Sequence, residues 1–204
     1  IIRVRQHQKV RIHFKNDLPA RSIIHWHGLH VPAKMDGHPM YVIPTGDTFT
    51  YEFEVLNRAG TYWYHSHSSL QEQSGLYGAI VIAPGAGNDS PLRDYAVVLS
   101  DWTDEDPHTV NRTLKRGSEW YALEKGSSQS ILGAARLGML DDYYQRELQR
   151  MPPMDIADVA YDRFLANGKP ELSLIALPGE TLRLRIIDGS ATTYFHIEFS
   201  GGPM

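Results

Sequence analysis

The sequence predicts an all-β protein of two β-sandwich domains in tandem, with one helical segment inserted in the second. Three observations predict this fold. Short segments that alternate apolar and polar residues, separated by turn residues, fill residues 1–84. A stretch rich in Gly and Pro follows at 85–91, and strand patterns return after it. Strand patterns on both sides of a linker indicate two domains of the same class.

The strands of the first domain, residues 1–84, are marked by alternating side chains. Residues 10–15 alternate Val, Ile and Phe with Arg, His and Lys, and residues 48–55 alternate apolar side chains with Thr and Glu. A period of two places one row on a core and the other row in solvent. Residues 76–83 are mostly apolar, as expected of a strand buried on both faces. The sequence therefore predicts a sandwich of short strands.

The second domain is predicted over residues 92–204 and begins with a strand at 95–99. Between about residues 129 and 151 the pattern becomes helical, and Pro152-Pro153 ends it. Apolar residues recur there at spacings of three and four, which predicts one helix. They are Leu137, Leu140, Tyr144, Leu148 and Met151.

A weak internal repeat supports two related domains. Residues 2–4 and 10–16 resemble residues 174–176 and 182–188, with the same spacing between the two parts. The chain begins inside a strand pattern at Ile1. We therefore expect the first domain to lack its first strand or strands and the second domain to be incomplete.

Composition excludes several classes of function. The 204 residues contain 20 Lys and Arg against 24 Asp and Glu, for a formal net charge of −4. This balance offers no basic stripe for phosphates, so we expect no nucleic-acid partner. No apolar run approaches the roughly 18 residues that a membrane span needs, so none is expected. The absence of Cys excludes disulfides, thiolate metal sites and thiol nucleophiles.

Two His-x-His motifs carry the clearest chemical signal, at His25-Trp26-His27 and His65-Ser66-His67. On a β-strand, residues i and i+2 point to the same face, so each motif presents two imidazoles side by side. Imidazole suits copper, zinc, iron and nickel, whereas calcium and magnesium prefer oxygen ligands. One such motif is compatible with ordinary histidines on a half-exposed strand. Two of them, each beside aromatic residues, favour a metal site.

These residues resemble a known family. His25-Trp26-His27-Gly28-Leu29 and the segment 60–67 look like the two amino-terminal copper motifs of the multicopper oxidases, and residues 71–78 look like the stretch that follows. Residues 99–102 are similar to the opening strand of the family's second domain. The helical insert and residues 182–191 most resemble the bacterial copper-resistance branch. The resemblance covers nearly the whole chain and implies tandem cupredoxin-like Greek-key β-sandwiches, copper as cofactor, and export to the periplasm.

The resemblance also implies roles for single residues. His25 would bind the type 2 copper, and His27, His65 and His67 would bind the type 3 pair. Asp36 matches an acid that the family places near the cluster for proton delivery, although Asp-Gly is also a common turn pair. We expect no copper ligand among the other histidines, which are His7, His13, His30, His38, His108 and His196.

The activity implied is that of a laccase-like or cuprous oxidase, which oxidises Cu(I) or small phenolic compounds and reduces dioxygen to water. In the family, a type 1 copper requires a Cys, and a carboxy-terminal cupredoxin domain supplies the other cluster ligands. We expect both to lie outside these 204 residues, so that the chain alone is inactive. Alternatives are a copper-sequestering module without turnover, a metal-free structural homologue and a copper nitrite reductase, which fits the paired motifs and the insert less well.

Overall fold

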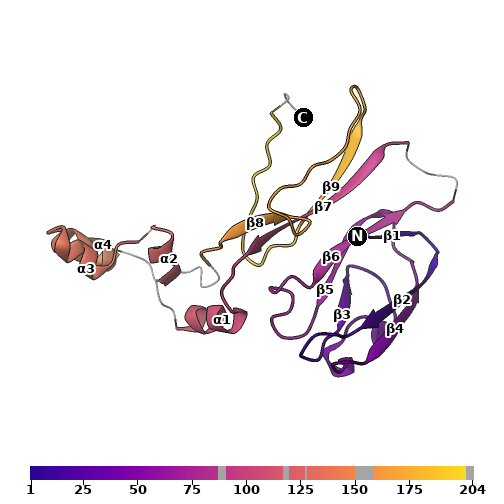
Figure 1. The fold of residues 1–204 in the computed structure, drawn as a ribbon, viewed down its shortest axis with the longest axis horizontal. Helices are drawn as coiled ribbons and strands as arrows, with labels where there is room; N and C mark the ends of the chain where they lie inside the picture. Colours follow the sequence, from indigo (N-terminus) through magenta and orange to yellow (C-terminus); the bar gives the residue numbers. More distant parts are fainter. Residues whose placement is uncertain (87–90, 117–119, 127, 150–158, 201–204) are drawn as a thin grey trace. The chain divides into compact units, whose positions relative to one another are not determined.

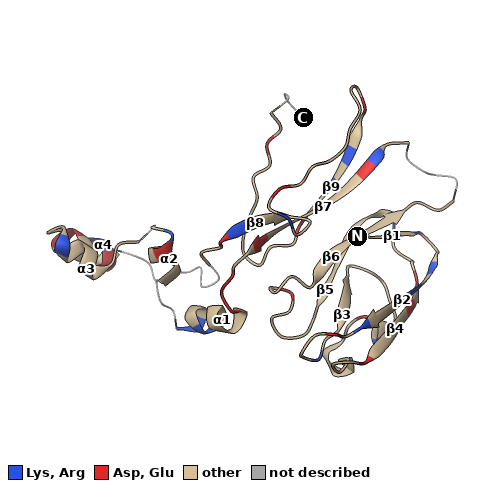
Figure 2. Cartoon of the chain, viewed as in Figure 1, with Lys and Arg blue, Asp and Glu red and all other residues tan. Residues whose placement is uncertain are grey.

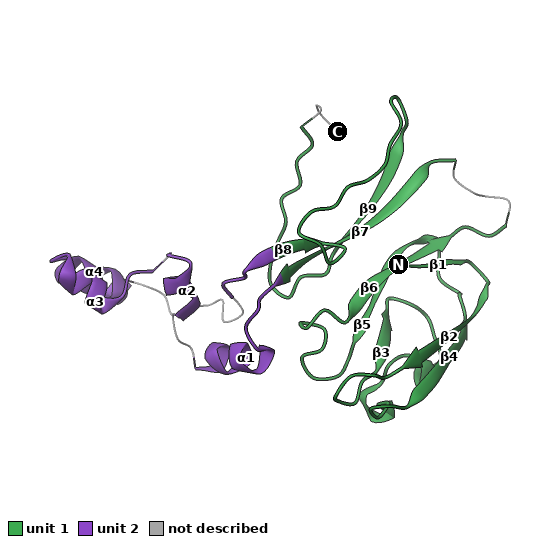
Figure 3. Ribbon diagram, in the orientation of Figure 1, with its two compact units in different colours: residues 1–101, 164–204 green, residues 102–163 purple. Residues whose placement is uncertain are grey.

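The structure is a computed structural model that describes residues 1–86, 91–116, 120–126, 128–149 and 159–200 (Figure 1). The chain forms two compact units, one made of Ile1–Asp101 with Phe164–Met204 and the other of Trp102–Arg163 (Figure 3). The first unit consists mainly of β-strands, with two short 3-10 helices at Ala33–Met35 and Pro39–Tyr41, and the second contains the described α-helices. This confirms the predicted fold class. The predicted domain boundary at 85–91 stays a prediction, because residues 87–90 lie outside the described residues.

A four-stranded sheet carries the two histidine motifs. Its strands are β1 (Ile2–Arg5), β6 (Tyr77–Ala83), β5 (Gly60–Ser66) and β3 (Ile24–His27), in that order across the sheet. β1 runs parallel to β6, whereas β5 is antiparallel to both of its neighbours. The two histidine-bearing strands, β3 and β5, therefore lie next to each other although their motifs are far apart in sequence.

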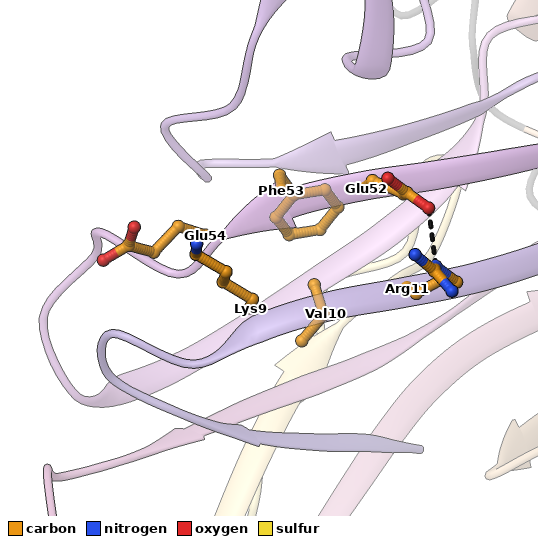
Figure 4. Close-up of a pocket in the computed structure, with 6 residues that line it drawn as sticks. All are labelled: Lys9, Val10, Arg11, Glu52, Phe53 and Glu54. Atoms are coloured by element: carbon orange, nitrogen blue, oxygen red, sulfur yellow. Dashed lines mark hydrogen bonds and ion pairs between the residues drawn. The ribbon is translucent and has the colours of Figure 1, made fainter.

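A second, two-stranded sheet pairs β2 (Lys9–Lys15) with β4 (Thr48–Glu54) in antiparallel register over seven residue pairs. Exposed and half-buried residues alternate along β2 as the sequence predicts. A shallow hollow on this sheet is shown in Figure 4, and its lining residues are Lys9, Val10, Arg11, Glu52, Phe53 and Glu54. Four of them are charged, and Arg11 pairs with Glu52 across the strands. We assign this hollow no function.

The core between the two sheets fixes which way β3 faces. Trp26 of β3 is 2% exposed, and its ring packs edge-on against Tyr51 of β4 with 5.1 Å between ring centroids. The backbone N–H of Ile24 donates a hydrogen bond of 2.9 Å to the Tyr51 hydroxyl. Because side chains alternate along a strand, burial of Trp26 turns His25 and His27 to the opposite face of the sheet.

The third sheet has the order β8 (Arg163–Ala166), β7 (Arg93–Trp102) and β9 (Leu182–Asp188), with β7 and β9 parallel. Small and branched residues of β6 and β7 form a buried cluster, which comprises Ala79, Val81, Ala96 and Val98. Arg185 binds Asp94 at 2.6 Å and donates to Thr61 Oγ1 at 3.0 Å. These contacts join the third sheet to the four-stranded sheet within the first unit.

The repeated sequence pattern forms a seven-residue strand in both places, as β2 and as β9. The structural repeat is partial. Residues 2–4 lie in β1, whereas the matching residues 174–176 form no strand. Acidic and basic segments occur together on β7 and β9 (Figure 2), and Asp94 of β7 pairs with arginines of β9.

The helical insert differs from the prediction. The helices of the second unit are α1 (Pro107–Lys115), α2 (Trp120–Glu124), α3 (Ile131–Arg136) and α4 (Leu140–Gln149). The single helix predicted over about 129–151 is therefore wrong, since two helices occupy its described part; residues 150–151 lie outside the described residues.

The break in the predicted helix has a local cause. Gly138 has φ of +69°, and the N–H groups of Gly138 and Met139 bond back to the carbonyls of Ala135 and Ala134 at 3.2 and 2.8 Å. This pair of backbone hydrogen bonds, together with a Gly in the left-handed conformation, is the Schellman motif that ends a helix. Within the described residues, no helix combines the length and apolarity needed to cross a membrane.

Candidate metal centre

Four histidines lie on one face of the four-stranded sheet. In the register of β3 with β5, His25 stands opposite His65 and His27 stands opposite Trp63. His67 follows the end of β5, where its backbone N–H bonds to the Ile23 carbonyl at 3.3 Å. The pairing brings the two motifs into direct contact.

The four imidazole rings form one cluster, so the structure brings together all four predicted ligands. His25 stacks on His67 with 4.3 Å between ring centroids, and His65 lies 5.2 Å from His67. His27 lies 5.6 Å from His25 and 5.4 Å from His65. One nitrogen from each of His25, His27 and His65 falls within 4.8 Å of the others, a spacing that could hold a metal ion.

One pair of nitrogens matches the spacing of two ligands on one ion. His27 Nδ1 lies 3.2 Å from His65 Nε2. With metal–imidazole bonds of about 2.0–2.1 Å, as for zinc, two ligating nitrogens at a tetrahedral angle are about 3.3 Å apart. A donor set of imidazole nitrogens suits copper, zinc, iron or nickel. The residues present therefore fit a transition metal, and copper is among the ions that they fit.

The loop at Asp36 and Gly37 fixes two of the rings. His25 Nδ1 donates to the Asp36 carbonyl at 2.9 Å, and His67 Nδ1 donates to the Gly37 carbonyl at 3.1 Å. These bonds place the proton on Nδ1 and leave Nε2 of both rings as the free donor for a metal. Asp36 Oδ1 also lies 3.0 Å from His25 Nδ1. Asp36 is thus both part of a turn and in contact with a predicted ligand.

Only glycine fits at position 37. Its φ is +72°, and a Cβ there would lie 2.3 Å from the backbone oxygen of Ile24. This close approach packs the loop against β3, directly before His25. Gly37 is therefore required by the close approach of the loop to β3 as well as by the turn.

His65 is the most buried ring, at 7% exposed. Its Nδ1 donates to the Ser66 carbonyl at 3.1 Å, and Glu72 Oε2 lies 2.8 Å from the same nitrogen. Glu72 was not predicted, because it reaches His65 through the turn that follows β5. The only sequence signal for it is a carboxylate within seven residues of the second motif.

Burial and mutual repulsion lower the pKa of two of the rings. For His27 and His67, burial is the largest cause, and the neighbouring imidazoles of the cluster add to it. Both effects favour the neutral ring, which is the form that binds metals. Trp63 stacks on His65 at 4.5 Å and covers one side of the cluster.

Other histidines with side-chain contacts lie elsewhere. His13 pairs with Thr50 on the two-stranded sheet, His7 lies 3.8 Å from Glu54, and the exposed His196 lies 3.3 Å from its neighbour Glu198. His38 accepts a hydrogen bond from the Met40 N–H and lies beside Tyr41. These contacts are separate from the cluster, and the ligand set stays a prediction.

Comparison with known proteins decides the family. Residues 1–87 match the sequence model of the family described as multicopper oxidase. The chain is 40% identical to copper resistance protein A of Escherichia coli over 216 residues, which cover 98% of this chain and 35% of that protein. The chain belongs to the multicopper oxidase family. The protein of the same name from Pseudomonas syringae pv. tomato is also 40% identical, with the same two coverages. These names agree with the copper-resistance branch that the sequence predicts.

Solved multicopper oxidases share the fold. McoA of Aquifex aeolicus superposes with a TM-score of 0.57 at 25% identity, over 93% of this chain and 36% of that chain. Fet3p superposes with a TM-score of 0.64 at 22% identity, over 93% of this chain and 30% of that chain, and it supports the fold alone. The cupredoxin-like prediction is confirmed. The chain spans about a third of the length of the two copper resistance proteins.

Proposed function

We propose that this chain supplies half of the ligands of a trinuclear copper cluster. In this proposal His25 binds the type 2 copper, and His27, His65 and His67 bind the type 3 pair. The observation that carries it is the single cluster of four imidazoles, in which the centroids of neighbouring rings lie 4.3 to 5.6 Å apart. Membership of the multicopper oxidases selects copper among the metals that imidazole suits.

The residues of the chain prepare this site before any metal binds. Hydrogen bonds from Nδ1 of His25 and His67 to backbone carbonyls fix the ring planes and the tautomers. His27 presents Nδ1 instead, towards Nε2 of His65. When bound, copper supplies one-electron redox chemistry and a binding place for dioxygen. Trp63 limits access of water on its side of the rings.

Asp36 is proposed to move protons. Reduction of dioxygen to water consumes protons, and a positioned carboxylate can relay them. The side chain of Asp36 is 38% exposed while its Oδ1 lies 3.0 Å from His25 Nδ1. The carboxylate therefore reaches both the solvent and the edge of the cluster.

We propose that this chain is part of a longer protein, called the parent protein below. The parent protein would oxidise Cu(I) or small phenolic compounds at a type 1 copper outside this chain. The sequence contains no Cys, which a type 1 copper needs. A carboxy-terminal cupredoxin domain supplies the remaining cluster ligands, so the chain alone is inactive. The resemblance to the copper-resistance branch supports a periplasmic location.

Two measurements on the parent protein and on this chain test the proposal. We expect its gene to encode a His-x-x-His-x-His element and a His-Cys-His element after Met204. We also expect the copper-loaded parent to consume oxygen with Cu(I) or a phenol, and the copper-loaded chain to consume none. If the parent lacks both elements and consumes no oxygen while the chain binds copper, the alternative of a copper-sequestering module holds instead. If the chain does not bind copper, both functions fail.

A further inference from the structure

The geometry points to Glu72 as the residue that positions His65 for metal binding. This inference rests on the proposed function, because it concerns how one of the proposed ligands is held. Glu72 Oε2 lies 2.8 Å from His65 Nδ1, which is shorter than the 3.1 Å bond from the same nitrogen to the Ser66 carbonyl.

A buried hydrogen-bond network places Glu72 at this position. The amide oxygen of the adjacent Gln71 accepts from the hydroxyls of Ser22 at 2.7 Å and Ser66 at 2.8 Å. Both serines are buried, at 0% and 3% exposed. The Leu76 N–H bonds to the Gln71 carbonyl, and the Leu76 carbonyl accepts from the Ser66 N–H, each at 3.0 Å. The turn after β5 is therefore closed at both ends, and Glu72 is held over His65.

The carboxylate acts on the far side of the ring from the cluster. An acceptor at His65 Nδ1 keeps the proton on that nitrogen and leaves His65 Nε2 unprotonated. His65 Nε2 is the nitrogen that lies 3.2 Å from His27 Nδ1. A carboxylate behind a ligating imidazole also makes the other nitrogen a stronger donor to the metal. Glu72 thereby does for His65 what the carbonyls of Asp36 and Gly37 do for His25 and His67.

A small hollow lies beside this carboxylate. Its volume is about 10 Å³, room for about one water molecule. The lining residues are Glu72, Gln73, Tyr77, Asp101, Gly189 and Ala191. Asp101 does not compete for His65, since its carboxylate accepts from the N–H groups of Ala191, Thr192 and Thr193 at 2.9 to 3.1 Å. The Glu72 side chain is 31% exposed, which limits the cost of placing its charge there.

The test compares the wild-type chain with Glu72→Ala and Glu72→Gln. Long-range ¹H–¹⁵N spectra of the metal-free proteins report the tautomer of His65, and Cu(II) titration reports affinity. We expect His65 to carry its proton on Nδ1 in the wild type and to become a mixture in Glu72→Ala, with copper binding weakened about 10- to 100-fold. Glu72→Gln keeps an acceptor but removes the charge, so its affinity should lie between the two.

Glu54→Ala is the matched control. It removes a carboxylate that also contacts a histidine, His7 at 3.8 Å, away from the cluster, and should change neither readout. An unchanged tautomer and unchanged affinity in both Glu72 variants, or in Glu72→Gln alone if Glu72→Ala does not fold, would overturn the inference. The tautomer is measured without metal. A wild-type chain that fails to bind copper would therefore contradict the proposed function, while the tautomer measurement would still test the role of Glu72.

Discussion

Replacing His25, His27, His65 and His67 together by Ala is expected to abolish tight copper binding. The four rings are the only imidazoles that the described structure gathers into one cluster, and the variant removes every nitrogen offered there. A ligand that binds only the folded state at 100 times its Kd stabilises that state by about 2.7 kcal/mol. Urea unfolding with and without Cu(II) should show this gain for the wild type and none for the variant.

The matched control for this variant replaces three histidines outside the cluster, His7, His13 and His196. It removes imidazoles that are largely exposed, so the gain from copper should stay at its wild-type value. Comparing each protein with and without copper cancels any change in stability caused by the substitutions themselves. A quadruple variant that gains as much as the wild type would refute the ligand assignment.

Gly37→Ala is expected to damage both the fold and the site. A left-handed backbone costs a non-Gly residue about 1–2 kcal/mol. The added Cβ would also lie 2.3 Å from the Ile24 backbone oxygen, so the loop must move away from β3. That movement shifts the carbonyls that hold His25 and His67. Urea unfolding should show that the free energy of unfolding falls by well more than the about 1–2 kcal/mol of the left-handed backbone. Copper affinity should fall as well.

Gly46→Ala separates the effect of the left-handed backbone from the effect of the contact with β3. Gly46 has a φ of +85°, but nothing lies within 4 Å of the Cβ that the variant would add. The control should therefore lose about 1–2 kcal/mol and keep the copper affinity of the wild type. Equal losses of stability in the two variants, with copper affinity unchanged in both, would show that the contact with β3 does not shape the site.

The strands and the placement of the four histidines could be predicted from the sequence because both depend on a period of two. Alternation marks β2 and β4, and the same period puts His25 with His27, and His65 with His67, on one face. The structure adds to this prediction the pairing of β3 with β5, whose register sets His25 opposite His65. Local pattern and tertiary structure agree at these positions.

The errors and omissions have a different origin. The predicted helix was wrong because the apolar spacing continues across Gly138, whose left-handed backbone ends α3. Glu72 could not be identified, since its place depends on the buried bonds of Gln71 with Ser22 and Ser66. A carboxylate close to the motif in sequence does not by itself show a contact that a closed turn creates.

The most direct test of the central claim is diffraction from a crystal of this chain soaked in copper, with data collected on both sides of the copper absorption edge. The account predicts an anomalous peak within bonding distance of both His27 Nδ1 and His65 Nε2, the two nitrogens that lie 3.2 Å apart. Copper found only at exposed histidines such as His13 or His196, with no peak at the cluster, would contradict it.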